Sequence, residues 1–225
     1  MLLNPMLKFS IITLFPEIIK PHLKFLPFKK AIDKNIIKVE LIQLRDFADD
    51  KHRTVDDKPY GGGIGMVLMP KPIYNAVSSL PYNSKRKIIG LAPSGKTFTQ
   101  QDAKRLSYEE DIVFISGRYE GIDQRILDNV CDEVFSIGNY VLSGGELPSL
   151  VIMESITRIL PDVLEKEDAS KIESFSDDSS HNIEYPQYTR PEIFNGWKVP
   201  KVLLNGNHKE IEEWRLNNSK SKITN

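Results

Sequence analysis

Residues 111–160 read DIVFISGRYEGIDQRILDNVCDEVFSIGNYVLSGGELPSLVIMESITRIL, and the order strand, loop, helix occurs twice in this stretch. The apolar runs Asp111–Ser116 and Glu133–Ile137 predict buried strands, whereas Asp123–Val130 and Leu147–Leu160 predict helices. Strands that alternate with helices in this way are typical of a parallel sheet with helices on both faces. The stretch therefore predicts an α/β fold with a mainly parallel sheet.

The same alternation continues toward the N-terminus. A helix is expected to start at Pro16 and to be broken near Pro21 and Pro27, because proline suits a first helical turn but not a helix interior. Arg45–Gly65, which is charged and ends in GGGIG, predicts a long loop. The other predicted elements are strands at Phe9–Phe15, Ile36–Leu44 and Lys87–Leu91, and helices at Pro70–Leu80 and from a Thr99 cap to about Leu106.

Composition limits the class of protein. The chain has 225 residues, of which 40% are hydrophobic and 27% charged, as is usual for a globular protein. Its one cysteine, Cys131, excludes an intrachain disulfide and is interpreted as a small buried apolar residue. No apolar run is long enough to span a membrane, and the first residues lack a signal-peptide pattern, so a cytoplasmic location is expected. The net charge of −1 does not favour a nucleic-acid partner, although a local basic patch would suffice.

Several loops that follow the predicted strands are rich in glycine and polar residues. In open parallel sheets, ligands bind at the carboxyl ends of the strands. The loops at this end are Arg45–Gly65, Ala92–Lys96, Gly117–Asp123 and Gly138–Glu146, the last of which could wrap its backbone closely around a ligand. A binding site is therefore expected at this end of the sheet.

One motif favours a different activity. Gly90–Thr97 reads GLAPSGKT and fits the phosphate-binding pattern G-x-x-x-x-G-K-[ST], in which Lys96 would pair with phosphates and Thr97 would hold magnesium. However, no later predicted strand ends in an aspartate suited to hold magnesium, and the other glycine-rich loops would remain unexplained. A phosphate-loop kinase or nucleoside triphosphatase is kept as the alternative.

The composition changes after the last predicted helix. Glu165–Glu184 is charged and rich in serine, which predicts a flexible linker. Apolar residues return from Pro186, and Asn207 is placed to cap a short helix through Trp214. We therefore expect a main domain at residues 1–160, a linker at 161–185 and a small second domain at 186–225.

Several long stretches, taken in order, resemble the bacterial tRNA (guanine-N1)-methyltransferase family of the SPOUT superfamily. The resemblance implies a trefoil-knotted α/β domain that binds S-adenosylmethionine, a homodimer with shared active sites and a small helical C-terminal domain. The implied reaction is methylation of N1 of the guanosine immediately 3′ of the anticodon, with the tRNA anticodon stem-loop as partner. The matching stretches are SIITLFPEI, RDFADDKHRTVDDKPYGGGIGMVL, GRYEGIDQRI, SIGNYVLSGGELP, YPQYTRPEIFNGWKVPKVLLNGNH and EIEEWR.

The resemblance also implies which residues bind the ligands. The residues expected to bind the cofactor are Leu91, Ala92, Pro93, Ser94, Gly95, Gly117, Tyr119, Glu120, Gly121, Ile137, Gly138, Asn139, Tyr140, Val141, Leu142, Ser143, Gly144 and Gly145. Those expected to contact tRNA are Arg45, Asp46, His52, Arg53, Asp56, Asp57, Tyr60 and Ser174. Mg²⁺ is a further ligand that the family suggests, although the histidines show no spacing typical of metal ligands.

The chemistry needs two further side chains. N1 of guanine carries a proton, so a general base must remove it while a cation stabilises the charge that builds on O6. The family pattern places the cation at Arg158 and the base at Glu173, where most members have aspartate before Ser-Phe. Asp177 and Asp178 are the other candidates for the base. A non-catalytic tRNA-binding relative is a further alternative. The sequence also ends soon after Arg215, earlier than in many members, so a reduced C-terminal domain is expected.

Overall fold

The computed structural model describes residues 6–164, 174–175 and 182–221 of the chain. The chain divides into two compact units, residues 1–165 and residues 166–225, and each is described by itself. The first unit contains every loop in which a bound cofactor is expected. Within the described residues, no helix is both long and apolar enough to cross a membrane.

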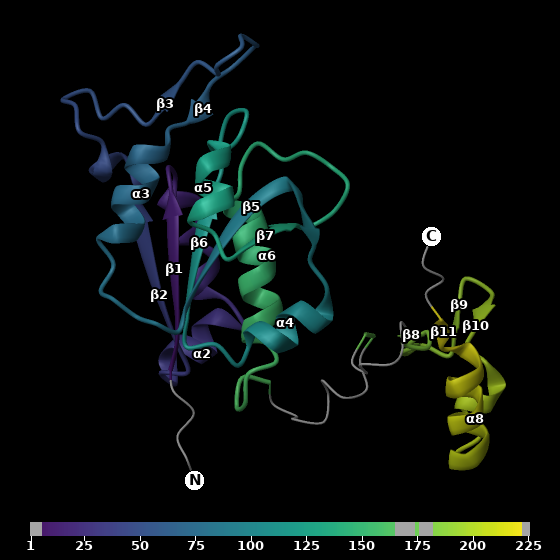
Figure 1. Ribbon diagram of the computed structural model, residues 1–225. Helices are drawn as coiled ribbons and strands as arrows, with labels where there is room; N and C mark the ends of the chain where they lie inside the picture. Colours follow the sequence, from purple (N-terminus) through teal and green to yellow (C-terminus); the bar gives the residue numbers. More distant parts are fainter. Residues whose placement is uncertain (1–5, 165–173, 176–181, 222–225) are drawn as a thin grey trace. The chain divides into compact units, whose positions relative to one another are not determined.

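The first unit is built on a five-stranded sheet with the order β2-β1-β6-β5-β7, in which every pair of neighbours is parallel (Figure 1). β6 lies at the centre and is buried along its whole length. In the register, Ile11 lies opposite Leu41 on one side and opposite Phe114 on the other. The strands are β1 (Leu7–Thr13), β2 (Ile37–Gln43), β5 (Arg86–Thr97), β6 (Asp111–Ser116) and β7 (Glu133–Ser136).

Both faces of this sheet are covered. Ile112 and Phe114 of β6 belong to one hydrophobic core, whereas Val113 and Ile115 belong to the other, because successive side chains of a strand point to opposite faces. The first core is completed by α1 (Pro16–Ile19), α2 (Phe28–Asp33), α4 (Gln100–Leu106) and α6 (Glu146–Thr157), and the second by α3 (Pro70–Ser78) and α5 (Gln124–Asn129). The predicted α/β fold with a parallel sheet is confirmed.

Proline and threonine set helix boundaries where the sequence predicts them. The segment after Pro16 is broken into α1, the 3-10 helix η1 (His22–Lys24) and α2, with Pro21 and Pro27 at the breaks. Thr99 caps α4, since its Oγ1 accepts a hydrogen bond from the backbone N–H of Asp102.

β5 is longer than its sequence predicts. The expected strand ends at Leu91, but β5 continues to Thr97 and pairs with β7 on both sides of a register shift between Leu91 and Lys96. Gly95 allows this pairing, because a Cβ there would lie 2.7 Å from the backbone nitrogen of Phe135. The predicted loop Ala92–Lys96 is therefore wrong: the whole motif Gly90–Thr97 lies within β5, with an irregularity at the register shift.

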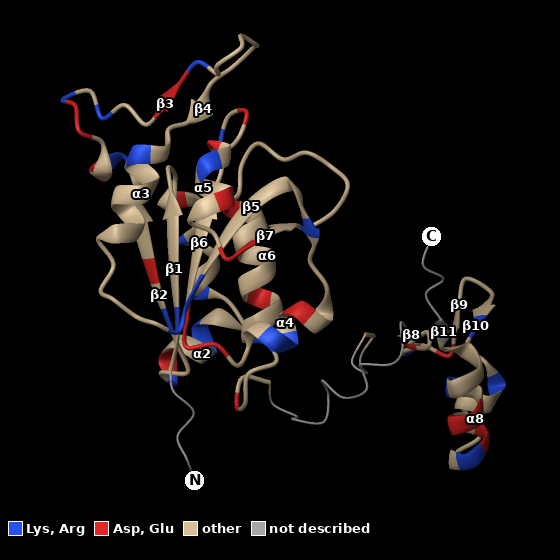
Figure 2. Ribbon diagram, viewed as in Figure 1, with Lys and Arg blue, Asp and Glu red and all other residues tan. Residues whose placement is uncertain are grey.

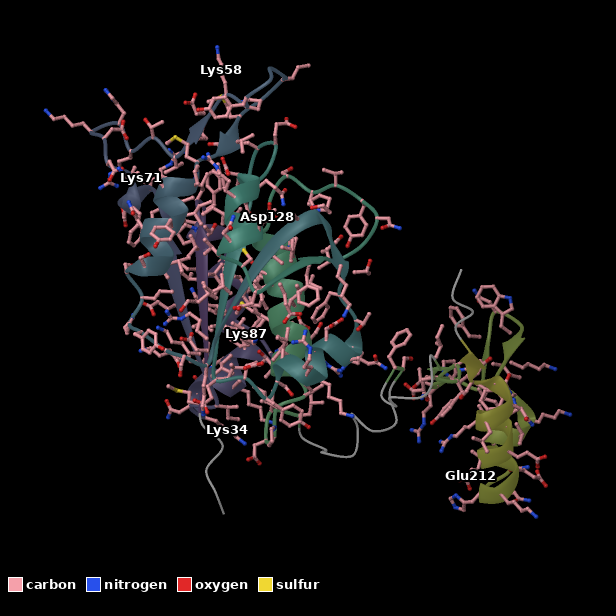
Figure 3. All side chains as sticks on the ribbon, viewed as in Figure 1. Lys34, Lys58, Lys71, Lys87, Asp128 and Glu212 are labelled. Carbon is pink, nitrogen blue, oxygen red and sulfur yellow. The ribbon has the colours of Figure 1, made fainter. Side chains whose placement is uncertain are left out.

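The segment Arg45–Gly65, here called the outer segment, extends beyond the carboxyl ends of the strands (Figure 1). It is mostly loop, as predicted, with the 3-10 helix η2 (Leu44–Phe47) at its start and β3 (Asp56–Asp57) paired antiparallel with β4 (Val67–Leu68). Figure 2 shows charges of both signs along it, and Figure 3 shows the side chain of Lys58 pointing away from the sheet.

The second unit contains α8 (His208–Asn218) and the 3-10 helix η3 (Lys201–Leu203). The side chain of Asn207 accepts hydrogen bonds from the backbone N–H groups of Lys209 and Glu210, so the predicted helix cap is confirmed. The ring of Trp214 packs edge-on against Tyr185 and Tyr188. This unit also has two pairs of short strands, β8 (Asn182–Ile183) with β11 (Lys220–Ser221) and β9 (Ile193–Phe194) with β10 (Trp197–Lys198).

Candidate active site

Three chain segments near the carboxyl ends of the strands line one pocket with a volume of about 190 Å³. They are Leu91–Pro93 in the middle of β5, the loop Gly117–Gly121 after β6 and the loop Gly138–Gly145 after β7. The two loops are here called the β6 loop and the glycine loop. All residues assigned to the cofactor from the sequence line this pocket except Ser94, Gly95 and Asn139. Residues that line it without having been predicted are Arg118, Phe135, Ser136 and Pro148.

The glycine loop packs directly on the end of β6. The backbone N–H of Gly145 donates a hydrogen bond of 2.8 Å to the carbonyl oxygen of Gly117. A Cβ at Gly145 would lie 2.7 Å from Cα of Ser116, so no larger residue fits there without a backbone shift. Gly138, at the other end of the loop, has φ of 151°, which side chains disfavour. The glycines are therefore needed for the shape of the pocket wall.

The pocket combines apolar side chains with backbone polar groups. Leu91, Phe135 and Pro148 supply apolar surface, and most residues of the glycine loop line the same space. Pockets of this kind bind flat or apolar groups and orient them through a few hydrogen bonds. The pocket therefore suits a ligand with an aromatic ring and polar edges.

A buried ion pair joins two walls of the pocket. The Nε atom of Arg118 lies 2.9 Å from Oε2 of Glu146, the first residue of α6, whose side chain is only 1% exposed. Oε1 of the same carboxylate accepts a hydrogen bond of 2.7 Å from Thr13 at the end of β1. The guanidinium also lies over the ring of Phe15, at 4.6 Å. The sequence pattern predicts no role for Arg118 or Glu146, although both lie in the glycine-rich stretches quoted above.

The residues predicted to contact tRNA in the first unit all lie in the outer segment. Arg53 forms an ion pair of 3.2 Å with Asp46, and Arg45 donates a hydrogen bond of 3.1 Å to the carbonyl oxygen of Arg53. The side chain of Tyr60 is 99% exposed. His52 and Asp57 are exposed, and Asp56 is half-buried. The segment therefore presents polar groups and one aromatic ring to solvent.

The outer segment is tied to the β6 loop. Just after it, the carbonyl oxygen of Met66 accepts a hydrogen bond of 2.9 Å from the N–H of Glu120. The N–H of Leu68 donates one of 2.9 Å to the carbonyl oxygen of Gly121. Nη2 of Arg45 reaches the hydroxyl of Tyr119 at 3.5 Å. The predicted tRNA segment and the predicted cofactor pocket are thus neighbours.

Of the two predicted catalytic residues, only Arg158 lies within the described residues. Glu146 starts α6 beside the pocket, whereas Arg158 caps its other end, and 12 helical residues span about 18 Å. Glu173, Asp177 and Asp178 lie outside the described residues. Ser174 belongs to the second unit, where its Oγ accepts a hydrogen bond of 2.9 Å from the N–H of Glu184.

The phosphate-loop interpretation of Gly90–Thr97 is not supported. The motif forms strand instead of a loop whose N–H groups could surround phosphates, and Nζ of Lys96 lies 2.8 Å from Oδ1 of Asp102. Burial raises the pKa of Asp102, but hydrogen bonds from Lys96 and Thr99 and the charge of Lys96 lower it by more. Lys96 is thus part of the ion pair at the start of α4 and does not line the pocket.

Two other expectations concern metal and thiol chemistry. Burial raises the pKa of the Cys131 thiol to about 12, so this cysteine is a neutral, partly buried residue. Within the described ranges, no three His, Cys, Asp or Glu side chains are grouped as metal ligands. The Mg²⁺ that the family suggests therefore gains no support from these residues.

Comparisons with known proteins agree with one another. The sequence matches the family described as tRNA (Guanine-1)-methyltransferase TrmD over residues 7–225. A protein of Clostridioides difficile named tRNA (guanine-N(1)-)-methyltransferase is 47% identical over 216 residues, which cover 95% of this chain and 92% of that protein. Proteins of the same name from Alkaliphilus metalliredigens and Treponema denticola are 48% and 49% identical, covering 95% and 93% of this chain and 87% and 84% of their own lengths.

Proposed function

Because this chain belongs to the tRNA (guanine-1)-methyltransferase TrmD family, we propose that it transfers a methyl group from S-adenosylmethionine to N1 of a guanosine in tRNA. The proposed target is the guanosine immediately 3′ of the anticodon. The observation that carries the proposal is the pocket at the carboxyl ends of β6 and β7, lined also by Leu91–Pro93 of β5, which adjoins the outer segment. The chain would bind the donor in the pocket and the tRNA along the outer segment.

The pocket fits the methyl donor by its chemistry. Leu91, Phe135 and Pro148 offer apolar surface to an adenine ring, and the backbone of the glycine loop offers hydrogen bonds to its edge and to an amino-acid group. At Gly144 a Cβ would overlap Arg118 and Glu146, so only glycine lets the loop backbone lie directly against these two side chains. When bound, S-adenosylmethionine supplies a methyl group already activated on a sulfonium. The protein mainly has to align the acceptor with the S–CH₃ bond.

The guanine requires more help than the donor. We assign the general base to Glu173, which keeps the carboxylate of the family's aspartate but is longer by one methylene, and the cation near O6 to Arg158. Arg158 lies about 18 Å along α6 from the pocket of its own chain. We therefore propose a homodimer in which Arg158 of one copy serves the pocket of the other. The cofactor loops would form the trefoil knot of SPOUT enzymes.

The tRNA is proposed to bind through its anticodon stem-loop. The target guanine must unstack from its neighbours to reach the pocket. Unstacking costs less free energy in a single-stranded loop than in a duplex. Tyr60 offers a fully exposed ring on which a base can stack. Residues 1–160 would then be the catalytic domain, residues 161–185 the linker that carries Glu173, and residues 186–225 a small domain that adds to the tRNA contact.

The reaction is tested by methyl transfer from labelled S-adenosylmethionine to an unmodified tRNA transcript with guanosine 3′ of the anticodon. A transcript with adenosine at that position, otherwise identical, is the control. We expect transfer to the guanosine transcript alone, with the label recovered as N1-methylguanosine after digestion. Transfer to both transcripts, or recovery of a different methylated base, would contradict the proposed target.

The role of Glu173 is tested by Glu173→Ala and Glu173→Asp in the full chain. Loss of a general base lowers kcat by roughly 10²- to 10⁴-fold, so Glu173→Ala should lose most activity at saturating donor, and Glu173→Asp should retain much more. If Glu173→Ala keeps most activity, the base lies elsewhere, and Asp177→Ala and Asp178→Ala are the next variants. A wild-type chain that binds donor and tRNA without turnover would instead support the non-catalytic relative.

A further inference from the structure

Arg118 and Glu146 connect the chain segments that follow three different strands. Thr13 ends β1, Arg118 lies in the β6 loop, and Glu146 follows the glycine loop after β7. One buried carboxylate receives hydrogen bonds from both of the other segments, at 2.7 Å from Thr13 and at 2.9 Å and 3.2 Å from Nε of Arg118. The relative positions of these segments are thus fixed at a single point behind the pocket wall.

The guanidinium of Arg118 is held in one orientation. Besides Nε, its Nη1 donates a hydrogen bond of 3.2 Å to the carbonyl oxygen of Ser143, in the glycine loop itself. The ring of Phe15 covers its face. The backbones of Arg118 and Gly144 also form an antiparallel bridge. A side chain held by so many contacts determines where the Ser143–Gly145 backbone lies.

The space around this pair is filled. A Cβ at Gly144 would overlap Nε of Arg118 and would lie 2.5 Å from Oε2 of Glu146. The glycine loop therefore rests on the ion pair itself, with no side chain between them. Any change in the pair has to move the backbone that lines the pocket.

Arg118 lines the pocket, but its charge is already compensated. The carboxylate of Glu146 is 1% exposed and lies against the guanidinium, so the two charges cancel at short range. A bound anion would gain little from this arginine. The geometry points to a role in shaping the loop and not in binding a charged group of the ligand.

We propose that Arg118, held by Glu146, is a positioning residue for the methyl donor, which acts by fixing the Ser143–Gly145 backbone. The inference rests on the proposed function, because it takes S-adenosylmethionine as the ligand of the pocket. Loss of the pair should weaken donor binding on the order of 10- to 100-fold, since displacement of a binding loop by about 1 Å has effects of this size.

The first experiment measures the Kd of S-adenosylmethionine by calorimetry for the wild type, Arg118→Met and Glu146→Gln. Arg86→Met is the matched control, because Arg86 forms a similarly buried pair with Asp111 whose residues do not line the pocket. We expect a higher Kd for both pocket variants and an unchanged Kd for Arg86→Met, each measured well below its own Tm. An unchanged Kd for Arg118→Met would overturn the inference, and so would an equal rise in Arg86→Met.

A second experiment separates positioning from direct contact. Decarboxylated S-adenosylmethionine lacks the negative group that an arginine would bind. If Arg118 acts through the loop, Arg118→Met weakens binding of both compounds by the same factor. A loss that affects S-adenosylmethionine alone would show that Arg118 binds the carboxylate, and the inference would be wrong. The double variant Arg118→Met/Glu146→Gln should bind no worse than the weaker single variant, whereas additive losses would mean that the two residues act independently.

Two precautions keep the result interpretable. If Arg118→Met does not fold, Phe15→Leu keeps the ion pair and removes only the ring over the guanidinium, and it should raise Kd roughly two- to fivefold. An unchanged Kd in that variant would count against the inference. If the wild-type chain does not bind S-adenosylmethionine, the proposed function itself is wrong. If the wild type binds it and the substitutions leave the Kd unchanged, only the role of Arg118 is wrong.

Discussion

The two ends of β6 carry two buried arginine–carboxylate pairs that are nearly alike. Asp111, the first residue of β6, lies 2.9 Å from Nε of Arg86, and the two side chains are 4% and 11% exposed. Arg118 follows Ser116, the last residue of β6, by two residues. Its Nε lies 2.9 Å from Oε2 of Glu146, and the side chains of Arg118 and Glu146 are 18% and 1% exposed. By distance and burial alone, the two pairs would be given the same role.

They differ in what they hold together. Arg86 and Asp111 bond further to Pro81 and Asn83, so that pair fixes one turn at the amino end of the sheet. Arg118 and Glu146 join segments after three strands at the carboxyl end, where parallel sheets bind their ligands. If Arg118 shapes the pocket as proposed, the position of an ion pair at the sheet, and not its strength, decides whether it supports stability alone or also shapes a site.

The largest effect is expected when the arginine of either ion pair is replaced. Arg118→Met and Arg86→Met each leave a buried carboxylate without its cation, so each should lower the free energy of unfolding by roughly 3–5 kcal/mol. Only Arg118→Met should also lower kcat/KM for the methyl donor. Urea unfolding and methyl-transfer kinetics on the same preparations check both statements. Equal losses of kcat/KM in both variants would contradict the different roles given to the two ends of β6.

A smaller effect is expected from an added methyl group. Gly144→Ala puts a Cβ onto the Arg118–Glu146 pair, and Gly90→Ala puts one 2.7 Å from Cδ2 of Leu127 in the core under α5. Both overpack and should cost about 1–3 kcal/mol of stability. Donor affinity should fall in Gly144→Ala and stay unchanged in Gly90→Ala. A loss of affinity in Gly90→Ala alone would contradict this account of the pocket wall.

The smallest effect is expected for Lys96, the exposed lysine of the motif Gly90–Thr97. The side chain of Lys96 is 66% exposed, so its ion pair with Asp102 should contribute less than about 1 kcal/mol, and Lys96→Ala should unfold almost as the wild type does. The wild type should show no ATP binding by calorimetry. ATP binding that Lys96→Ala abolishes would revive the phosphate-loop alternative.

The same pair has a pH dependence with a defined sign. The pKa of Asp102 is lowered from 3.8 in the folded chain, so the carboxylate contributes stability above about that pH and loses it as pH falls through the lower value. In Lys96→Ala this pKa moves up toward its ordinary value. Stability measured between neutral pH and pH 3 should therefore fall less in Lys96→Ala than in the wild type, and a steeper fall in the variant would contradict the assignment.

The order of strands and helices could be predicted because local patterns determine it: apolar runs mark β6 and β7, and Pro16 and Thr99 mark helix starts. β5 was predicted too short because Pro93 and Gly95 are typical of turns. They lie at a register shift, and the residues on both sides of it pair with β7, which no local pattern reveals. The glycine loops were recognised as a site, but the pairing of Arg118 with Glu146, 28 residues apart, could not be seen in sequence. The predicted helix Leu147–Leu160 already placed Arg158 about a helix length from the glycine loop, and α6 confirms this.

We propose above that the methyl donor binds at the carboxyl ends of β6 and β7, beside Leu91–Pro93 of β5. Backbone hydrogen exchange of the full chain, measured with and without S-adenosylmethionine, tests it most directly. We predict that exchange slows in peptides that contain Leu91–Gly95, Gly117–Gly121 and Ile137–Gly145, and stays unchanged around Arg86 and Asp111. Slower exchange at the Arg86–Asp111 end, with no change in the glycine loop, would contradict the account.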